Sequence, residues 1–178
     1  MADVDLFALY EGAAESVFRL EAQARYAVPA ESARLRAFEE GRPLPADPAV
    51  SRTLNVIRAL ATAGTRIHRV HVLDLPLTRY LRYELTVYAE NVQAGEEVRI
   101  ANRAWHLQLA ELTEDFVLLD GDTEDAAVVW MRYDSSGRIA GREYSTSAVD
   151  VLRCRRERDL ALAHSVPLEK FTAAADKG

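Results

Sequence analysis

The spacing of apolar residues predicts helices in the first third of the chain. Three stretches carry apolar residues three and four positions apart: residues 7–26, 31–40 and 47–63. The third is the best marked, because Asp47 can cap its first turn and Pro48 suits the first helical position. Gly64 can end it. We therefore expect residues 1–63 to form an N-terminal helical segment.

After residue 64 the pattern changes to a mixture of strand and helix. Alternating or β-branched segments predict strands over residues 65–74, 97–101, 116–120, 126–133 and 138–145. Helical spacing predicts helices over residues 76–94 and 148–166, and a short tail helix after Pro167. Residues 134–137 form a turn. We expect an α/β fold, with α+β as the alternative: a small mixed sheet flanked by helices, with an N-terminal helical subdomain.

The length of the chain favours one hydrophobic core. A chain of 178 residues is large enough to bury a core of its own and is most simply one domain. The helical segment 1–63 and the α/β unit 64–178 are therefore expected to pack together.

Composition and charge narrow the functional classes. The chain is 49% hydrophobic and 28% charged, as is usual for globular proteins. Its formal charge of −6 argues against a basic surface that binds the phosphate backbone of nucleic acids. The longest apolar run is far shorter than the roughly 18 residues that span a bilayer. Acids stand near the start, where a signal peptide carries basic residues. We expect a cytoplasmic protein that neither spans a membrane nor binds nucleic acid directly.

The residue types that usually hold metals or cofactors are sparse. Cys154 is the single cysteine, and the four histidines are scattered. His68 and His71 fall on opposite faces of their strand, so they cannot chelate one ion together. The acidic loop 120–125 lacks the spacing of an EF-hand. No metal and no cofactor are therefore predicted.

One strand and the helix after it carry the candidate site. Period-two geometry puts Arg69 and His71 on the same strand face among apolar residues, where an unpaired polar group would cost several kcal/mol. Tyr80, Glu84 and Tyr88 share one face of the following helix. Glu84 is the natural partner for Arg69 or for Arg99, which would fix the packing of helix on strand.

Two interpretations of these residues remain open. In the first they form a structural ion-pair network. In the second they line a pocket for an anion or another small ligand at the carboxyl end of the strand, where open α/β sheets usually bind. The candidate ligand-binding residues are Arg69, His71, Tyr80, Glu84 and Arg99. No catalytic residue is assigned.

The order of motifs over residues 64–165 resembles one half of a phospholipase D-like domain, in particular the degenerate versions fused to bacterial transcription regulators. Active members carry His-x-Lys followed by an Asp five residues after the lysine. If Asp120 is that aspartate, Thr113 and Asp115 stand at the histidine and lysine positions. Thr lacks the imidazole nucleophile and Asp115 would repel phosphate, so the resemblance implies a scaffold without catalysis.

Nearly the whole chain also resembles an uncharacterised family of small cytoplasmic proteins from actinobacteria, often encoded beside helix-turn-helix regulators. The segments that carry it are R-V-x-V at 69–72, P-L-T-R-Y-L-R-Y-E-L at 76–85, N-x-x-A-G-E-E-V-R at 91–99, D-F-V-L-L-D at 115–120 and M-R-Y-D-x-x-G at 131–137. The resemblance implies a non-catalytic regulatory or adaptor protein, partnered with such a regulator or with itself as a homodimer. The alternative is a small-molecule binder or an enzyme that uses the Arg/His/Glu pocket.

Overall fold

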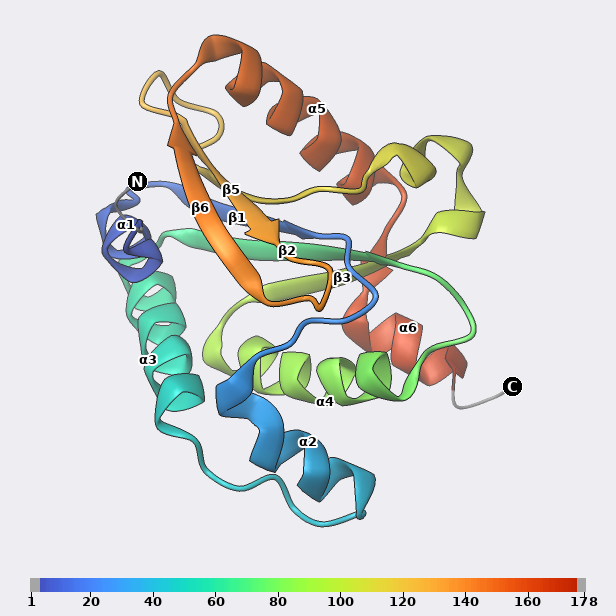
Figure 1. The fold of residues 1–178 in the computed structure, drawn as a ribbon. Helices are drawn as coiled ribbons and strands as arrows, with labels where there is room; N and C mark the ends of the chain where they lie inside the picture. The colour runs from blue at the N-terminus through green and yellow to red at the C-terminus, as the bar shows by residue number, and fades with distance from the viewer. Residues whose placement is uncertain (1–3, 176–178) are drawn as a thin grey trace.

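The computed structural model describes residues 4–175 and has one mixed sheet with helices on both faces (Figure 1). The α/β class predicted from the sequence is confirmed. The seven strands lie in the order β6-β5-β4-β1-β2-β3-β7. Their bounds are β1 Ser16–Glu21, β2 Arg66–Leu73, β3 Glu97–Asn102, β4 Asp115–Leu119, β5 Ala127–Tyr133, β6 Ile139–Ser145 and β7 Val166–Pro167.

The helices follow most of the predicted bounds. The α-helices are α1 Leu6–Gly12, α2 Ser32–Glu39, α3 Pro48–Ala63, α4 Arg79–Ala94, α5 Ala148–Ala163 and α6 Leu168–Ala175. Short 3-10 helices are η1 Pro29–Glu31, η2 Arg103–Trp105 and η3 Leu107–Glu111. The carboxylate of Asp47 accepts the Ala49 and Val50 amides at the start of α3, and Gly64 ends this helix with φ +91°. Within residues 4–175, no helix is long and apolar enough to cross a membrane.

The helix predicted over residues 7–26 is wrong. Helix α1 ends at Gly12, and β1 follows in the centre of the sheet, parallel to β2 and antiparallel to β4. Val17, Phe18 and Leu20 are all buried, so both faces of β1 lie inside the protein. A strand covered on both faces loses the strict alternation that identifies it in a sequence, and its apolar residues then also fit a helical spacing.

Helices cover the two faces of the sheet unequally. Helix α5 lies over one face (Figure 1). On this face Phe18, Phe116 and Trp130 pack in the same cluster as Val151 and Cys154. Helices α1 and α3 cover the other face beside β1, β4 and β5, and α4 and α6 cover it beside β3. Helix α2 packs on the outside of α4. The face under α1, α3 and α4 carries the buried charged side chains of Glu21 and Arg69.

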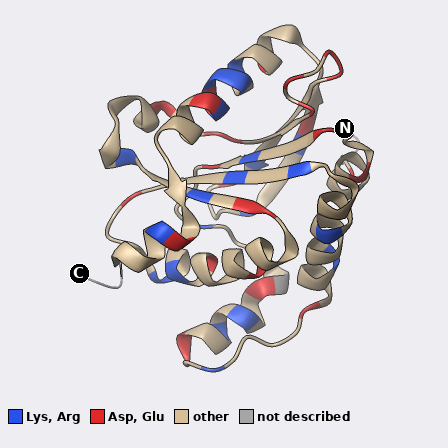
Figure 2. Cartoon of the chain, turned by 180° about the vertical axis from the view of Figure 1, so that it is seen from behind, with Lys and Arg blue, Asp and Glu red and all other residues tan. Residues whose placement is uncertain are grey.

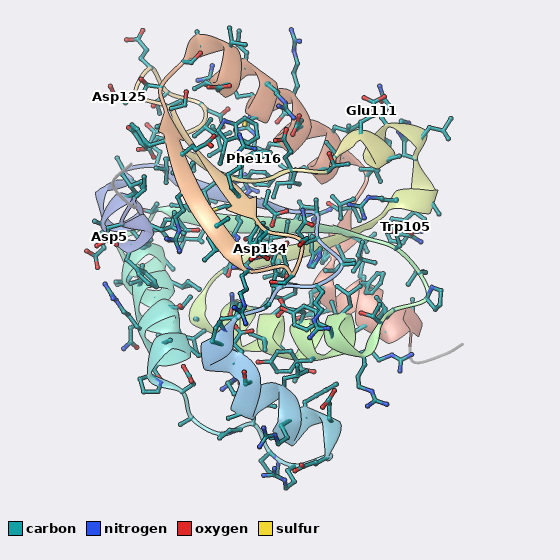
Figure 3. The ribbon with its side chains drawn as sticks, viewed as in Figure 1. Asp5, Trp105, Glu111, Phe116, Asp125 and Asp134 are labelled. Atoms are coloured by element: carbon teal, nitrogen blue, oxygen red, sulfur yellow. The ribbon has the colours of Figure 1, made fainter. Side chains whose placement is uncertain are left out.

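The chain between β1 and α2 is attached to the hairpin of β5 and β6. The amide of Ala27 donates to the carbonyl of Gly137 at 2.8 Å. Gly137 has φ +82°, and a Cβ there would lie 2.8 Å from the carbonyl oxygen of Arg25. The predicted turn at 134–137 is confirmed, and Figure 3 labels its Asp134 beside the segment that follows β1. This contact places residues 25–31 over one end of α4.

Candidate ligand-binding site

A cavity of about 580 Å³ lies between the sheet and helix α4. Its floor comes from β1, β2 and β5, and its walls come from α1, α3, α4, residues 26–31 and the β5–β6 hairpin. Polar side chains that line it include Arg19, Glu21, Arg69, Tyr80, Glu84 and Tyr88. The volume falls in the range of about 300–1,000 Å³ that small-molecule sites occupy.

A second hollow is larger, at about 780 Å³, but it runs along the outer side of α3. Its charged lining residues, Glu11 and Arg52, are exposed. The cavity beside α4 is instead lined by charged groups that are held out of water. Figure 2 shows blue and red residues on the central strands. We therefore take the cavity beside α4 as the candidate site.

Arg69 is held by two acids from outside α4. Its Nε lies 2.8 Å from Glu96 Oε1 and its Nη1 lies 3.0 Å from Glu21 Oε2. Asn91 of α4 donates to the second oxygen of Glu96 at 2.6 Å. The prediction that Glu84 pairs with Arg69 is wrong, because Glu21 on the adjacent strand and Glu96 before β3 occupy the guanidinium.

Glu21 joins three donors at the cavity floor. It pairs with Arg19 at 2.8 Å, with Arg69, and with the hydroxyl of Tyr88, which donates at 2.5 Å. Burial by itself would raise the pKa of Glu21, but the attraction of Arg19 and Arg69 holds this pKa well below its usual range. Two arginines therefore face two acidic side chains, Glu21 and Glu96, and the formal charges of this group balance.

Among residues 4–175, no cationic side chain forms an ion pair with Glu84. It is only 6% exposed and lines the cavity from α4. The hydroxyl of Tyr80 donates to its Oε1 at 2.7 Å, and this is its one hydrogen bond among the residues that the structure describes. Burial and then the nearby charge of Glu21 raise the pKa of Glu84 to about 7. The second carboxylate oxygen can accept a donor from a molecule in the cavity.

Tyrosine rings connect Glu84 with Arg19 along one wall. The ring of Tyr26 lies 6.5 Å from that of Tyr80 and 5.1 Å from that of Tyr133. Tyr133 in turn contacts Arg19, whose charge lowers the pKa of the Tyr133 hydroxyl against the larger, raising effect of burial. Within residues 4–175, the buried Nε of Arg19 has no hydrogen-bond partner. The cavity thus has an acceptor at Glu84 and an aromatic wall that leads from Glu84 to Arg19.

The sequence of this chain matches one known protein family. A family model described as a domain of unknown function, DUF6879, matches residues 5–173. The chain belongs to the DUF6879 family. No curated protein matches it. The match agrees with the predicted membership of an uncharacterised family, and it covers both the helical N-terminal third and the sheet.

Of the predicted site residues in this DUF6879 protein, three line the cavity: Arg69, Tyr80 and Glu84. His71 lies behind them and is fully buried, with Nδ1 2.8 Å from the Tyr88 hydroxyl and Nε2 3.0 Å from the carbonyl of Gln23. Burial lowers the pKa of His71. His71 therefore positions Tyr88 and the chain after β1, and it reaches the cavity only through Tyr88.

Arg99 lies apart from the other predicted residues. Its neighbours Val98 and Ile100 pack under α4 and α6, so the side chain of Arg99 points to the opposite face of the sheet. There it bonds the Ser165 side chain at 2.9 Å and the Ser165 carbonyl at 2.7 Å. Arg99 thus joins β3 to the segment that follows α5 and does not line the cavity.

The acids of the supposed phospholipase D pattern bind backbone amides. Asp120 accepts the amides of Ala14, Glu15 and Ser16 at 2.7–3.0 Å, and these bonds lower its pKa against the effect of burial. Asp115 accepts the amide of Ala22 and the Tyr26 hydroxyl. Both carboxylates thus anchor the ends of β1 in this family member.

Sequence reasoning missed most of the residues that line the cavity, among them Arg19, Glu21, Tyr26 and Tyr133. The first three lie in residues 7–26, for which the spacing of apolar residues predicted a helix. A usable signal was the run Val17-Phe18, which favours a strand. In the described part of the chain no group of three or more His, Cys, Asp or Glu residues is placed to hold a metal ion.

Proposed function

We propose that the protein binds a small organic molecule in the cavity beside α4 and does not transform it. One observation carries this proposal: Glu84 is buried at the cavity wall with Tyr80 as its sole hydrogen-bond partner among the described residues. Burying a carboxylate without full pairing is costly, so such groups are usually completed by a ligand or serve a site. A ligand donor at the second oxygen would complete this group.

The other charges support binding over catalysis. Arg69 is occupied by Glu21 and Glu96, and the acids at positions 115 and 120 accept backbone amides. Side chains fixed in this way give a rigid wall, which lowers the entropic cost of binding.

A ligand screen with a blocked cavity tests the proposal. Val50 of α3 lines the cavity, and Val50→Phe would fill part of it. Ala49→Phe is the matched control, because Ala49 is the exposed neighbour on the same helix. Ligand-observed NMR with a library of small metabolites should find molecules that bind the wild type and Ala49→Phe but bind Val50→Phe at least about tenfold more weakly. Equal binding by all three proteins would refute the proposal.

A second candidate function is that of an adaptor for a helix-turn-helix regulator, as the family resemblance suggests. One observation favours it: large apolar side chains are exposed at the end of β6 and in the first turns of α5. Tyr144 is 50% exposed, Val149 76% and Leu152 51%. Exposed apolar residues that lie close together often mark protein contacts.

Size-exclusion chromatography and titration calorimetry with the neighbouring regulator test the adaptor role. We expect a complex that Leu152→Glu weakens and that Ile139→Glu, on the other end of β6, does not. Self-association without the regulator would instead indicate a homodimer. A lack of any interaction at tens of micromolar would rule the adaptor role out.

A further inference from the structure

We infer that the cavity beside α4 accepts an organic cation, an amine on an apolar or aromatic body, whose ammonium group pairs with Glu84. This inference rests on the proposed function and names the ligand class. It departs from the anion pocket that the arginines suggested in the sequence.

The charged groups at the cavity favour a cationic ligand. The guanidinium groups of Arg19 and Arg69 already face the carboxylates of Glu21 and Glu96 at 2.8–3.0 Å. Adding a ligand anion there would compete with two buried acids. Glu84 stands outside this balanced group. Of the other charged residues that line the cavity, Arg142 and Glu31 have opposite signs and Asp5 is exposed, so an ionised Glu84 leaves a surplus negative charge at the α4 wall. A cation is the ligand that neutralises it.

The burial of Glu84 also favours a cationic ligand. A carboxyl group that is 6% exposed has lost most of its water, and Tyr80 replaces only one hydrogen bond. A charge-assisted hydrogen bond from an ammonium group to the remaining oxygen is about twice as strong as a neutral one. A neutral ligand with a hydroxyl group would supply the bond without the charge.

The aromatic wall of the cavity fits such a ligand as well. Tyr80, Tyr26 and Tyr133 follow one another in this order at ring-centroid distances of 6.5 and 5.1 Å, and the row begins at Tyr80, which bonds Glu84. Ring faces attract a cation and also pack against an aromatic body. Val87 and Val50 line the same cavity and favour an apolar body. An acid at the end of such a wall suits an arylalkylamine better than a fully hydrophilic cation.

Three probes with one aromatic body test the inference: 2-phenylethylamine, 2-phenylethanol and 3-phenylpropanoate. Titration calorimetry or ligand-observed NMR on the full chain at pH 8 gives their dissociation constants. We expect the amine to bind at least about tenfold more tightly than the alcohol and the acid. Glu84→Gln should weaken amine binding by about tenfold and change alcohol binding by less than about twofold. Glu111→Gln, on the exposed η3, is the control and should change neither.

The inference is overturned if the acid binds as tightly as the amine, or if Glu84→Gln leaves amine binding unchanged while circular dichroism shows a folded protein. If none of the probes binds but the metabolite screen finds anionic or neutral ligands blocked by Val50→Phe, the inference fails and the proposed function stands. If neither the probes nor the library bind, both fail.

Discussion

Replacing Glu84 with Gln should change how the stability of the protein depends on pH. Gln keeps an oxygen that can accept the Tyr80 hydroxyl but cannot ionise. In the folded protein burial raises the pKa of Glu84 from 4.5 to about 7. Below pH 4.5 the carboxyl is protonated in both the folded and the unfolded chain, so its ionisation does not lower the free energy of unfolding. Between these values the unfolded chain releases the proton while the folded protein retains it, and rising pH therefore favours unfolding.

The size of the effect follows from the two pKa values. They differ by about 2.5, and each pKa unit corresponds to about 1.4 kcal/mol, so the penalty reaches about 3 kcal/mol at pH 8. Glu84→Gln removes it. The variant should match the wild type near pH 4.5 and exceed its free energy of unfolding by up to about 3 kcal/mol at pH 8.

Urea unfolding at pH 4.5 and pH 8 measures the difference. Asp115, whose pKa is raised to about 6 by burial and then by Glu21, makes the wild type lose stability over the same range. It is present in both proteins, so its effect cancels in the comparison. Glu111→Gln should follow the wild type at both pH values. A difference between Glu84→Gln and the wild type that is the same at pH 4.5 and pH 8 would refute the reasoning.

Three further predictions concern the buried ion pairs, the glycine that ends α4 and the proposal that the protein is not a nuclease. Arg69→Met should lower the free energy of unfolding by about 3–5 kcal/mol in urea titrations, because it leaves Glu21 and Glu96 buried without their shared cation; a loss below 1 kcal/mol would contradict the pairing. Gly95→Ala should lower the free energy of unfolding by about 1–3 kcal/mol, because Gly95 has φ +112° and a Cβ there would lie 2.8 Å from Ala61 Cβ. Gly12→Ala is the control: a Cβ at Gly12 meets nothing within 4 Å, so the loss should be less than 1 kcal/mol. Thermal unfolding measures both variants. Incubation with single- and double-stranded DNA, with and without Mg²⁺, should yield no cleavage; turnover lost on replacing Asp120 would overturn the non-catalytic proposal.

The sequence predicted the elements that carry clear end signals. Helix α3 lies between the Asp47 cap and Gly64, and β2 lies one residue inside its predicted bounds. These features depend on local chemistry, which a sequence displays directly. Helix α4 begins at Arg79, after a cap at Thr78, and not at Pro76. Local sequence patterns therefore predicted most of the helices and strands, with errors of a few residues at their ends.

The candidate site was predicted only in part, because it depends on strand order. Helical spacing placed Tyr80 and Glu84 together, and strand geometry turned Arg69 toward them. The position of β1 beside β2 could not be read from the pattern, so Glu21 was not recognised as the partner of Arg69. Arg99 was misplaced for a similar reason: the parallel register pairs it with Val70, which faces α5. Register is a tertiary property that spacing along one strand does not reveal.

Because β1 is central, any ligand that binds in the cavity would bind only to the completely folded sheet. Residues 17–20 of β1 pair with residues 116–119 of β4, which lie about 100 positions later in the chain. Until that long loop closes, the floor that Arg19 and Glu21 provide does not exist. Ligand binding would then be thermodynamically linked to folding of the whole sheet. Above saturation, the free energy of unfolding would rise in proportion to the logarithm of the ligand concentration, and the unfolding midpoint would rise with it.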